Sequence, residues 1–415
     1  MVRRSKLVSM GRALVAVFVF STISVLVLLH ARALHADVTQ PSAATQDALS
    51  GTPLGADHLL GDAIALGNLS VFPVYAKSPV DLGEFTTLER AISANEAEVR
   101  ELGSDGAQAH AGDPLGAAQV NTLVVQNKGK RSILVLAGTV VKGGKQDRQI
   151  AEDFVVEAGK TVDVAAFCVE QGRWNGTRDG KSTGGRFVAH KTLALSKLRE
   201  AGAYEGNQSQ VWAEVGKVNA AHAKDAPSST LMASADDPAL AQKRAQLAGS
   251  AARALGSVKH ASHVVGVAYA VEGEVLGVRW FAGPKLFELY RDTLLESAAF
   301  EAITAEAEAK ASGKASKTTP AKAADVSGFV ARMESETVSE QKARHGQVGA
   351  KKKADAGYAS ELSVELPAAS PGAKPKAAPV TKDYLRRSAP KPQPRGSMHE
   401  EVQVQKRMPQ APIRK

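Results

Sequence analysis

The chain has 415 residues and a formal net charge of +9, from 52 Lys or Arg against 43 Asp or Glu. Residues 310–415 alone carry 21 Lys or Arg against 10 Asp or Glu, so residues 1–309 sum to −2. Because this body has no positive surplus and no nucleic-acid-binding motif, we expect no nucleic-acid partner. The single cysteine, Cys168, excludes an internal disulfide.

Residues 1–36 have the pattern of an export signal. Four basic residues precede the uncharged run Ala13–Leu29, and small residues follow near Ala33 and Ala36. The run of 17 residues is long for a signal peptide and short for a membrane span, which takes ~20 residues. We therefore expect a cleaved signal peptide or a single N-terminal membrane anchor. Either one places the body in the periplasm or cell envelope.

The globular domain is expected to follow a linker. Residues 37–56 are rich in Ser, Thr, Pro and Gly without an apolar period, which predicts the linker. The domain then spans residues 57–309 and begins with a strand within Leu66–Ala76. Thr86 and Glu89 form a capping-box pattern, which predicts a short helix after that strand.

Short strands at tight spacing come next. Residues 96–102 alternate between apolar and polar side chains, and four more apolar stretches lie at 121–127, 132–142, 148–156 and 161–170. Turn residues separate these stretches, as expected between adjacent antiparallel strands. The pattern predicts an antiparallel β-meander.

Helices and a hairpin complete the domain. The expected elements are a helix with Val211, Val215 and Val218 on one face, a helix capped by Asp237 before Pro238, a hairpin at 263–281 turning at Glu272-Gly273, and a helix from Pro284 to about Ala305. The fold class is therefore α+β, with helices packed on one face or end of the antiparallel sheet.

Residues 310–415 differ in composition from the domain. They hold 10 of the 18 prolines and are rich in Ala and Lys, which predicts a disordered basic tail. Such a tail would bind anionic envelope polymers or a membrane surface by charge, an attraction that salt screens.

Two polar stretches meet in the predicted meander. Strand 148–156 runs away from a Gly-Gly turn and the next strand returns toward it, so GGKQDR (143–148) ends beside CVEQGRW (168–174). A turn centred on Gly159 would place Arg148 opposite Glu170, to within one residue of register. The convergence itself does not depend on that register.

This edge of the sheet is the expected site. Its candidate ligand-binding residues are Lys145, Gln146, Arg148, Glu170, Arg173 and Trp174. The loop 172–186 adds five glycines and four Arg or Lys residues, and arginine can bind phosphate or carboxylate at two points. We expect a small anionic ligand or a partner there, without a cofactor. No metal is expected, because the histidines lack the paired spacing of a zinc site.

Three other interpretations of the same residues stay open. In the first, Asp147 and Glu170 are the acid and base of a hydrolase that acts on a phosphate- or ribose-containing ligand. In the second, Cys168 is a nucleophile with His190 as its base and Glu170 or Asp163 as the group that orients it. In the third, the polar run is a buried salt-bridge lattice that aligns the strands, and the tail carries the function.

The stretches 136–148, 151–174, 207–218 and 265–302 closely resemble the ARG and Rhodanese-Phosphatase-superfamily-associated Protein domain family. The combination of GKQ-x-R with CVExGRW carries the resemblance, which covers roughly residues 66–305. It implies a domain without an established reaction, in a context of nucleotide or ADP-ribose chemistry. Thr139 stands where many relatives carry an acidic residue, so the resemblance implies no general base at that position.

Overall fold

The structure, a computed structural model, describes residues 49–102, 121–173, 175–178, 180–366 and 376–388. The predicted export segment 1–36 lies outside these residues, as do Trp174 and the last part of the predicted tail, 389–415. Within the described ranges, no helix is long and apolar enough to cross a membrane.

The largest sheet in the described residues is antiparallel and has ten strands. In spatial order they are β1 (Thr52–Leu54), β2 (His58–Leu60), β4 (Leu69–Ala76), β16 (Val264–Val271), β17 (Glu274–Phe281), β21 (Lys376–Arg386), β20 (Gly357–Leu366), β19 (Gln347–Lys353) and β18 (Glu340–Arg344), with β3 (Ile64–Leu66) beside β4. Strands from the two ends of the domain thus form one sheet, which β21 joins in the middle.

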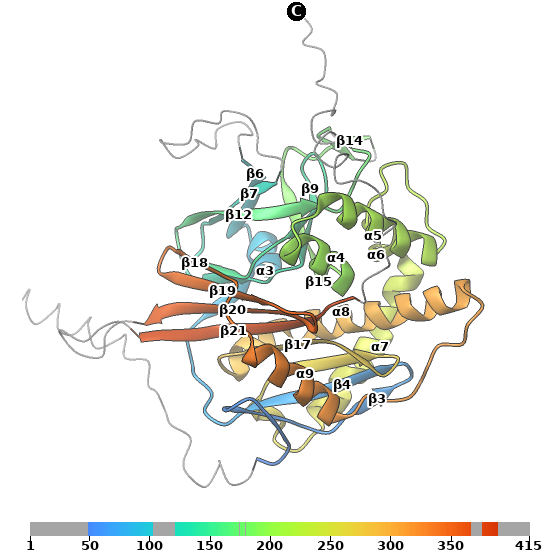
Figure 1. Cartoon of the computed structure of the whole chain (residues 1–415). Helices are drawn as coiled ribbons and strands as arrows, with labels where there is room; N and C mark the ends of the chain where they lie inside the picture. The colour runs from blue at the N-terminus through green and yellow to red at the C-terminus, as the bar shows by residue number, and fades with distance from the viewer. Residues whose placement is uncertain (1–48, 103–120, 174, 179, 367–375, 389–415) are drawn as a thin grey trace, which may run out of the picture.

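Smaller sheets lie above it in Figure 1. The six-stranded sheet has the order β15 (Phe187–Leu193), β9 (Thr139–Gly143), β10 (Arg148–Ile150), β12 (Thr161–Cys168), β7 (Thr122–Asn127) and β6 (Ala97–Glu101). A three-stranded sheet contains β11 (Phe154–Val156), β8 (Ser132–Val135) and β5 (Phe85–Thr87), and β13 (Thr177–Arg178) pairs with β14 (Lys181–Ser182). Strands β5 and β8 are parallel, whereas the six-stranded sheet is antiparallel throughout.

Helices cover both faces of the ten-stranded sheet. Helices α7 (Pro238–Gly256) and α8 (Pro284–Ala311) pack on one face, and α9 (Ala323–Ser335) packs on the other through Phe329 and Met333. The remaining helical segments are α3 (Leu88–Ser93), α4 (Ser196–Arg199), the π-helix Glu200–Tyr204, α5 (Gln208–Ala221), α6 (Met232–Ala235) and the 3-10 turn Ala261–His263. The predicted α+β class is confirmed, and α9 adds a helix on the second face.

Strand β4 illustrates how one sheet serves two cores. Leu69 and Val71 belong to the core beneath α7 and α8, whereas Phe72 and Val74 belong to the core beneath α9. Successive side chains of a strand point to opposite faces, so a strand that is buried along its whole length is covered on both.

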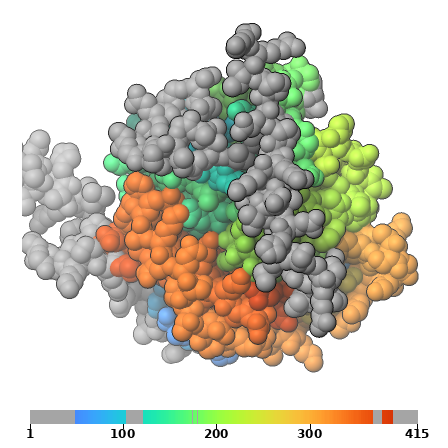
Figure 2. Space-filling view, turned by 45° about the horizontal axis from the view of Figure 1, so that its top comes forward, coloured from blue at the N-terminus to red at the C-terminus, as the bar shows by residue number. Residues whose placement is uncertain are grey.

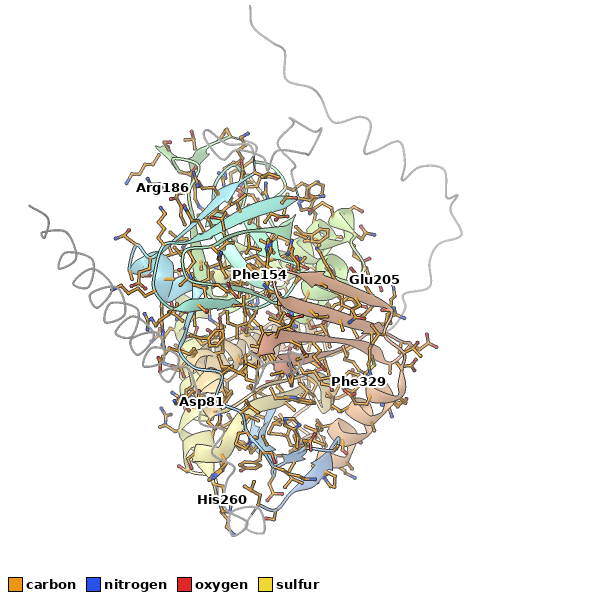
Figure 3. The ribbon with its side chains drawn as sticks, turned by 90° about the vertical axis from the view of Figure 1, so that its left-hand side faces the viewer. Asp81, Phe154, Arg186, Glu205, His260 and Phe329 are labelled. Carbon is orange, nitrogen blue, oxygen red and sulfur yellow. The ribbon has the colours of Figure 1, made fainter. Side chains whose placement is uncertain are left out.

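The predicted strands 132–142 and 148–156 are each divided in two. Gly138, with φ of +90°, turns the chain between β8 and β9, and residues 151–153 separate β10 from β11. Because β8 pairs with β11 and β9 pairs with β10, the hairpin bends as a unit from one sheet into the other. Figure 3 shows Phe154 of β11 near the middle of the molecule.

The prediction of a disordered tail from residue 310 is wrong for α9 and for β18 to β21. Helix α9 buries Val326, Phe329, Val330 and Met333, a helical i, i+3, i+4, i+7 pattern that the Lys- and Ala-rich composition concealed. The linker prediction is wrong at residues 52–54, which form β1. The domain therefore extends at both ends beyond the predicted range 57–309.

The C-terminal hairpin, which consists of β18 and β19, packs against the smaller sheets. Gln347 of β19 accepts from the Val155 N–H at 2.7 Å and donates to the Val155 carbonyl at 2.9 Å, so one side chain pairs with the outer edge of β11. Arg344 of β18 binds Glu152 at 2.8 Å. Figure 2 shows the orange-red hairpin beside the green residues of the smaller sheets.

Local signals in the sequence were mostly accurate. Val211, Val215 and Val218 of α5 are buried, and Asp237 accepts from the Leu240 N–H at the start of α7. The hairpin turn falls at Glu272-Gly273, which have φ of +54° and +84°. The N-cap of α3 is Thr87 and not the predicted Thr86, since Thr87 accepts from the Arg90 N–H.

Candidate functional site

The two predicted polar stretches meet at one end of the six-stranded sheet. Arg148 pairs with Cys168, and the Val169 N–H donates to the Asp147 carbonyl at 2.9 Å. The predicted pairing of Arg148 with Glu170 is therefore wrong by two residues, a shift that keeps every side chain on its expected face. The Gly159 turn does not set this register, because β11 before it pairs in the other sheet.

The turn between β9 and β10 requires its two glycines. Gly143 and Gly144 have φ of +136° and +47°. A Cβ at Gly143 would lie 2.2 Å from the Arg186 carbonyl oxygen, and one at Gly144 would lie 2.2 Å from the Phe187 ring. The turn is thus held against the start of β15, and the polar residues after it are held with it.

These residues form a group that we call the edge cluster. Its members are Glu101, Lys145, Gln146, Asp147, Arg148, Glu170 and Arg173. All but Lys145 are buried. The predicted site residues are therefore brought together, apart from Trp174, which lies outside the described residues. Glu101, at the end of β6, was not predicted. The sequence offered one signal for Glu101, namely an acidic side chain near the end of the predicted alternating strand 96–102.

Arg173 uses all five of its N–H groups. Nε and Nη2 donate to the two oxygens of Glu170 at 2.9 and 2.8 Å. Nη1 donates to the Gly144 and Asn175 carbonyls at 2.7 and 3.0 Å, and Nη2 also donates to the Gly143 carbonyl at 3.0 Å. A guanidinium has five donors, so Arg173 holds the turn and has none left for a ligand.

The buried carboxylates of the cluster are also occupied. Asp147 accepts from the Gly143 N–H at 3.0 Å, from Arg178 at 2.5 Å and from the Thr230 hydroxyl at 2.7 Å. Burial, and then the charge of Glu170, raise the pKa of Asp147. Burial alone would also raise the pKa of Glu170, but hydrogen bonds from Arg173, Ser228 and the Asp147 N–H hold it below its ordinary value.

Arg148 is paired much less well than Arg173. Its side chain is 2% exposed, yet its closest carboxylate oxygen, on Glu101, lies 3.5 Å from Nη2. Nη1 lies 3.4 Å from the Gln146 amide oxygen and 3.5 Å from the Asp147 carbonyl, and Nε has no acceptor. These are long contacts for hydrogen bonds, so this buried cation is under-supplied with acceptors.

Exposed cations lie near the cluster. The Lys145 side chain is 45% exposed, with Nζ 4.0 Å from Glu101, and Arg178 is 26% exposed beside Asp147. Lys181 and Arg186 are exposed on and just after the small β13–β14 hairpin. Figure 3 shows Arg186 near the top of the molecule, at the end where this hairpin lies. The surface around the edge cluster therefore carries several positive charges.

Cys168 is not placed as a nucleophile. It is 1% exposed, burial raises the pKa of its thiol, and the Gln208 amide binds its backbone N–H and carbonyl, both at 2.8 Å. His190 lies on β15, which β9 and β10 separate from β12, and it contacts Asp236 at 3.3 Å and Thr192 at 2.8 Å. Asp163 lies beside Arg344. The structure does not bring His190 or Asp163 to the thiol.

A second group of buried charges was not predicted. We call Asp153, Arg199, Tyr204, Arg279 and Asp383 the central cluster. Arg279 donates to Asp153 at 2.9 and 3.1 Å and to one oxygen of Asp383 at 3.1 Å. Arg199 and the Tyr204 hydroxyl donate to the other oxygen of Asp383. The cluster joins β17 and β21 to the bend between β10 and β11.

The chemistry of the edge cluster suits binding better than proton transfer. Asp147 and Glu170 already accept from arginines, which keeps them from reaching a substrate, whereas Arg148 has only long contacts to its acceptors. Among the residues that the structure describes, no group of three or more His, Cys, Asp or Glu side chains is arranged to hold a metal ion.

Comparison with known proteins identifies a family but no characterised relative. No curated protein and no solved structure matches the chain. The family model described as ARG and Rhodanese-Phosphatase-superfamily-associated Protein domain matches residues 57–367. That range includes both halves of the edge cluster and extends through α9 to β20, beyond the point where the sequence resemblance ended. Since the match covers more than half of the chain, the protein belongs to the ARG and Rhodanese-Phosphatase-superfamily-associated Protein domain family.

Proposed function

We propose that this domain binds a small anionic ligand at the edge cluster, with Arg148 as its buried anchor. The contrast between the two arginines of the edge cluster carries the proposal. Arg173 makes five hydrogen bonds of 2.7 to 3.0 Å, whereas the contacts of Arg148 are 3.4 to 3.5 Å and its Nε has no acceptor. A buried cation is costly unless it is well paired, which favours a ligand that supplies the missing acceptors.

Glu101 occupies the place that the anion would take. Its Oε1 lies 3.5 Å from Arg148 and accepts from the Lys145 N–H at 3.0 Å, and its side chain is 11% exposed. An incoming carboxylate or phosphate would displace the Glu101 carboxylate from Arg148 and bind the guanidinium at two points. Glu101 is thus a competitor for the site, within reach of the surface.

The other charges of the cluster have supporting roles in this proposal. Arg173 and Glu170 fix the Gly143-Gly144 turn, which positions Arg148 at the start of β10. Lys145 and the exposed cations of the neighbouring hairpin attract anions to this end of the sheet, an attraction that falls with added salt.

Hydrolysis of a phosphate- or ribose-containing ligand is the second candidate. Its support is the opposite displacement of two pKa values, upward at Asp147 and downward at Glu170, which is typical of acid–base pairs. However, Asp147 is 0% exposed, and it would have to lose Arg178 before it could meet a substrate. Binding without catalysis therefore remains the main proposal.

We propose that the domain works outside the inner membrane, in the periplasm or attached to the envelope. The support is the basic and then uncharged pattern of residues 1–36, with a single N-terminal anchor as the alternative to a cleaved signal. Residues 389–415 carry six Lys or Arg against two Glu, so that segment would contribute to binding of anionic polymers or membrane surfaces. A reporter enzyme fused after residue 388 and active only outside the cytoplasm tests the location.

A thermal-shift screen of the purified full chain tests the binding proposal. We would screen nucleotides, ADP-ribose, sugar phosphates and peptidoglycan fragments, and we expect at least one class to raise the unfolding temperature. Arg148→Met should remove that response, while Lys181→Met, which changes an exposed cation nearby, should keep it. An equal response in the wild type and in Arg148→Met would refute Arg148 as the anchor.

The competitor role of Glu101 has its own test. Glu101→Gln keeps the shape of the side chain and removes its charge, so we expect tighter binding of the ligand found in the screen. Glu98→Gln, on the same strand but bound to Lys128 at the surface, is the matched control. Weaker binding in Glu101→Gln would mean that Glu101 supports the site and does not compete for it.

A further inference from the structure

A small cavity lies beside the central cluster. It has a volume of about 20 Å³ and is lined by Arg199, Tyr269, Arg279, Glu301 and Asp383 together with apolar side chains such as Leu294. A space of this size accommodates one water-sized particle. A cavity lined by charged side chains is not expected to stay empty, because apolar cavities are the ones that remain dry.

Both arginines that line the cavity have a donor without a partner. Arg199 is 4% exposed and its Nε has no acceptor; Arg279 is 3% exposed and its Nη2 has no acceptor. Buried donors of a charged group without an acceptor are costly, and their occurrence in a native structure requires an explanation. Two of them beside one cavity point to a common acceptor.

Two acceptors beside the cavity, Asp383 and Ser297, are already used. One oxygen of Asp383 accepts from Arg279, and the other accepts from Arg199 and Tyr204. Ser297 accepts from the Leu193 N–H at 2.9 Å and donates to the Thr293 carbonyl at 2.6 Å. A water molecule would need acceptors for its own two hydrogens, whereas an anion only accepts.

The charges around the cavity also favour an anion. Asp153, which pairs with Arg279, lines a different cavity. Burial raises the pKa of Glu301, which shifts this carboxyl group toward its neutral form. Two guanidinium groups line the space together with Asp383, the carboxylate that they share.

We infer that this cavity is a binding site for one small monovalent anion, such as chloride, held by Arg199 and Arg279. The site is separate from the edge cluster and does not depend on the proposed function. Because its two arginines come from α4 and β17, the bound anion would link these elements across the middle of the molecule.

Diffraction from crystals of the full chain grown in bromide tests the occupant. We expect an anomalous peak in the cavity, within hydrogen-bonding distance of Arg199 Nε and Arg279 Nη2. Ordinary water density at that position, or no density, would overturn the inference.

Thermal unfolding provides a second test in solution. At constant ionic strength, replacing gluconate with chloride should raise the unfolding temperature by about 2–4 °C, because gluconate is too large for the cavity. Val267→Ile adds a methylene on the face of β16 that lines the cavity, without removing a charge, and should abolish the chloride effect. Val348→Ile, on the C-terminal hairpin, should retain it. Equal unfolding temperatures of the wild type in both salts would contradict the inference.

Discussion

The edge cluster and the central cluster both contain two buried arginines, but they divide the available acceptors differently. In the edge cluster one arginine, Arg173, takes five acceptors and the other, Arg148, is left with long contacts. In the central cluster Arg199 and Arg279 share Asp383 closely, and each has one donor without an acceptor. In the edge cluster, therefore, one arginine lacks close hydrogen-bond acceptors, whereas in the central cluster each of the two arginines lacks one acceptor.

This difference shows how the surroundings decide what an incompletely paired arginine can do. Arg148 lies beside Glu101 and the 45% exposed Lys145 at the end of a sheet, and the proposed ligand would approach from that side. Arg199 and Arg279 lie between layers, next to space for a single small particle. Substitutions should therefore affect stability in the central cluster and ligand binding at Arg148.

The largest loss of stability is expected from Asp383→Ala. It leaves two buried guanidinium groups without their shared carboxylate, which should cost about 4 kcal/mol in the free energy of unfolding, as measured in urea. Glu361→Ala is the control on the neighbouring strand β20, because it removes a carboxylate that is 37% exposed. It should change the free energy of unfolding by less than about 1 kcal/mol. Similar losses in the two variants would mean that the central cluster does not stabilise the fold.

The two arginines of the edge cluster should differ from each other. Arg173→Met leaves Glu170 buried without its partner and should cost about 3 kcal/mol. Arg148→Met replaces a poorly paired cation with an apolar side chain of similar length, so its cost should stay within about 1 kcal/mol. Urea unfolding of both variants measures the difference. Equal costs would make Arg148 a structural residue like Arg173 and weaken its assignment as the ligand anchor.

A smaller, pH-dependent effect is expected at Glu301. Its folded-state pKa is raised by burial, partly offset by Ser196, Lys197 and Arg199. A raised pKa means that its protonation stabilises the fold below the unfolded-state pKa, and that this stability is lost as the pH rises through the folded-state value. Relative to Glu301→Gln, which does not titrate, the wild type should therefore lose stability as the pH increases. The prediction would be contradicted if the difference in the free energy of unfolding between the wild type and Glu301→Gln stayed constant from below the unfolded-state pKa to above the folded-state pKa.

The smallest effect concerns Cys168, where we expect none under native conditions. Its thiol is 1% exposed and burial raises its pKa, so a thiol reagent should not label the folded protein. Labelling should begin only when denaturant unfolds the chain. Rapid labelling of the native protein would reopen the interpretation of Cys168 as a nucleophile.

Elements with strong local signals could be predicted from the sequence. Helix α5, the N-cap at Asp237 and the Glu272-Gly273 turn depend on residues only a few positions apart. The meeting of GGKQDR with CVEQGRW was also predictable, since neighbouring antiparallel strands bring those ends together. Its register was not, because β11 leaves the sheet before the turn.

Features that depend on distant residues could not be predicted. Asp153 and Asp383 of the central cluster are 230 positions apart, and no local pattern links them. The one local indication of a buried charge was Arg279 itself, because it lies in a largely apolar strand. The poor pairing of Arg148 is likewise a matter of side-chain geometry, which the motif GKQDR does not reveal.

The position of β21 has a consequence for how the chain folds during synthesis. Strand β21 lies between β17 and β20 and supplies Asp383, so the two halves of the ten-stranded sheet are not hydrogen-bonded to each other until it is in place. Until residue 386 has left the ribosome, β17 presents an open edge to which other chains can add, and Arg199 and Arg279 lack their shared carboxylate. Assembly of the complete ten-stranded sheet must therefore wait for nearly the whole described domain, and such pairing between distant strands favours slow folding.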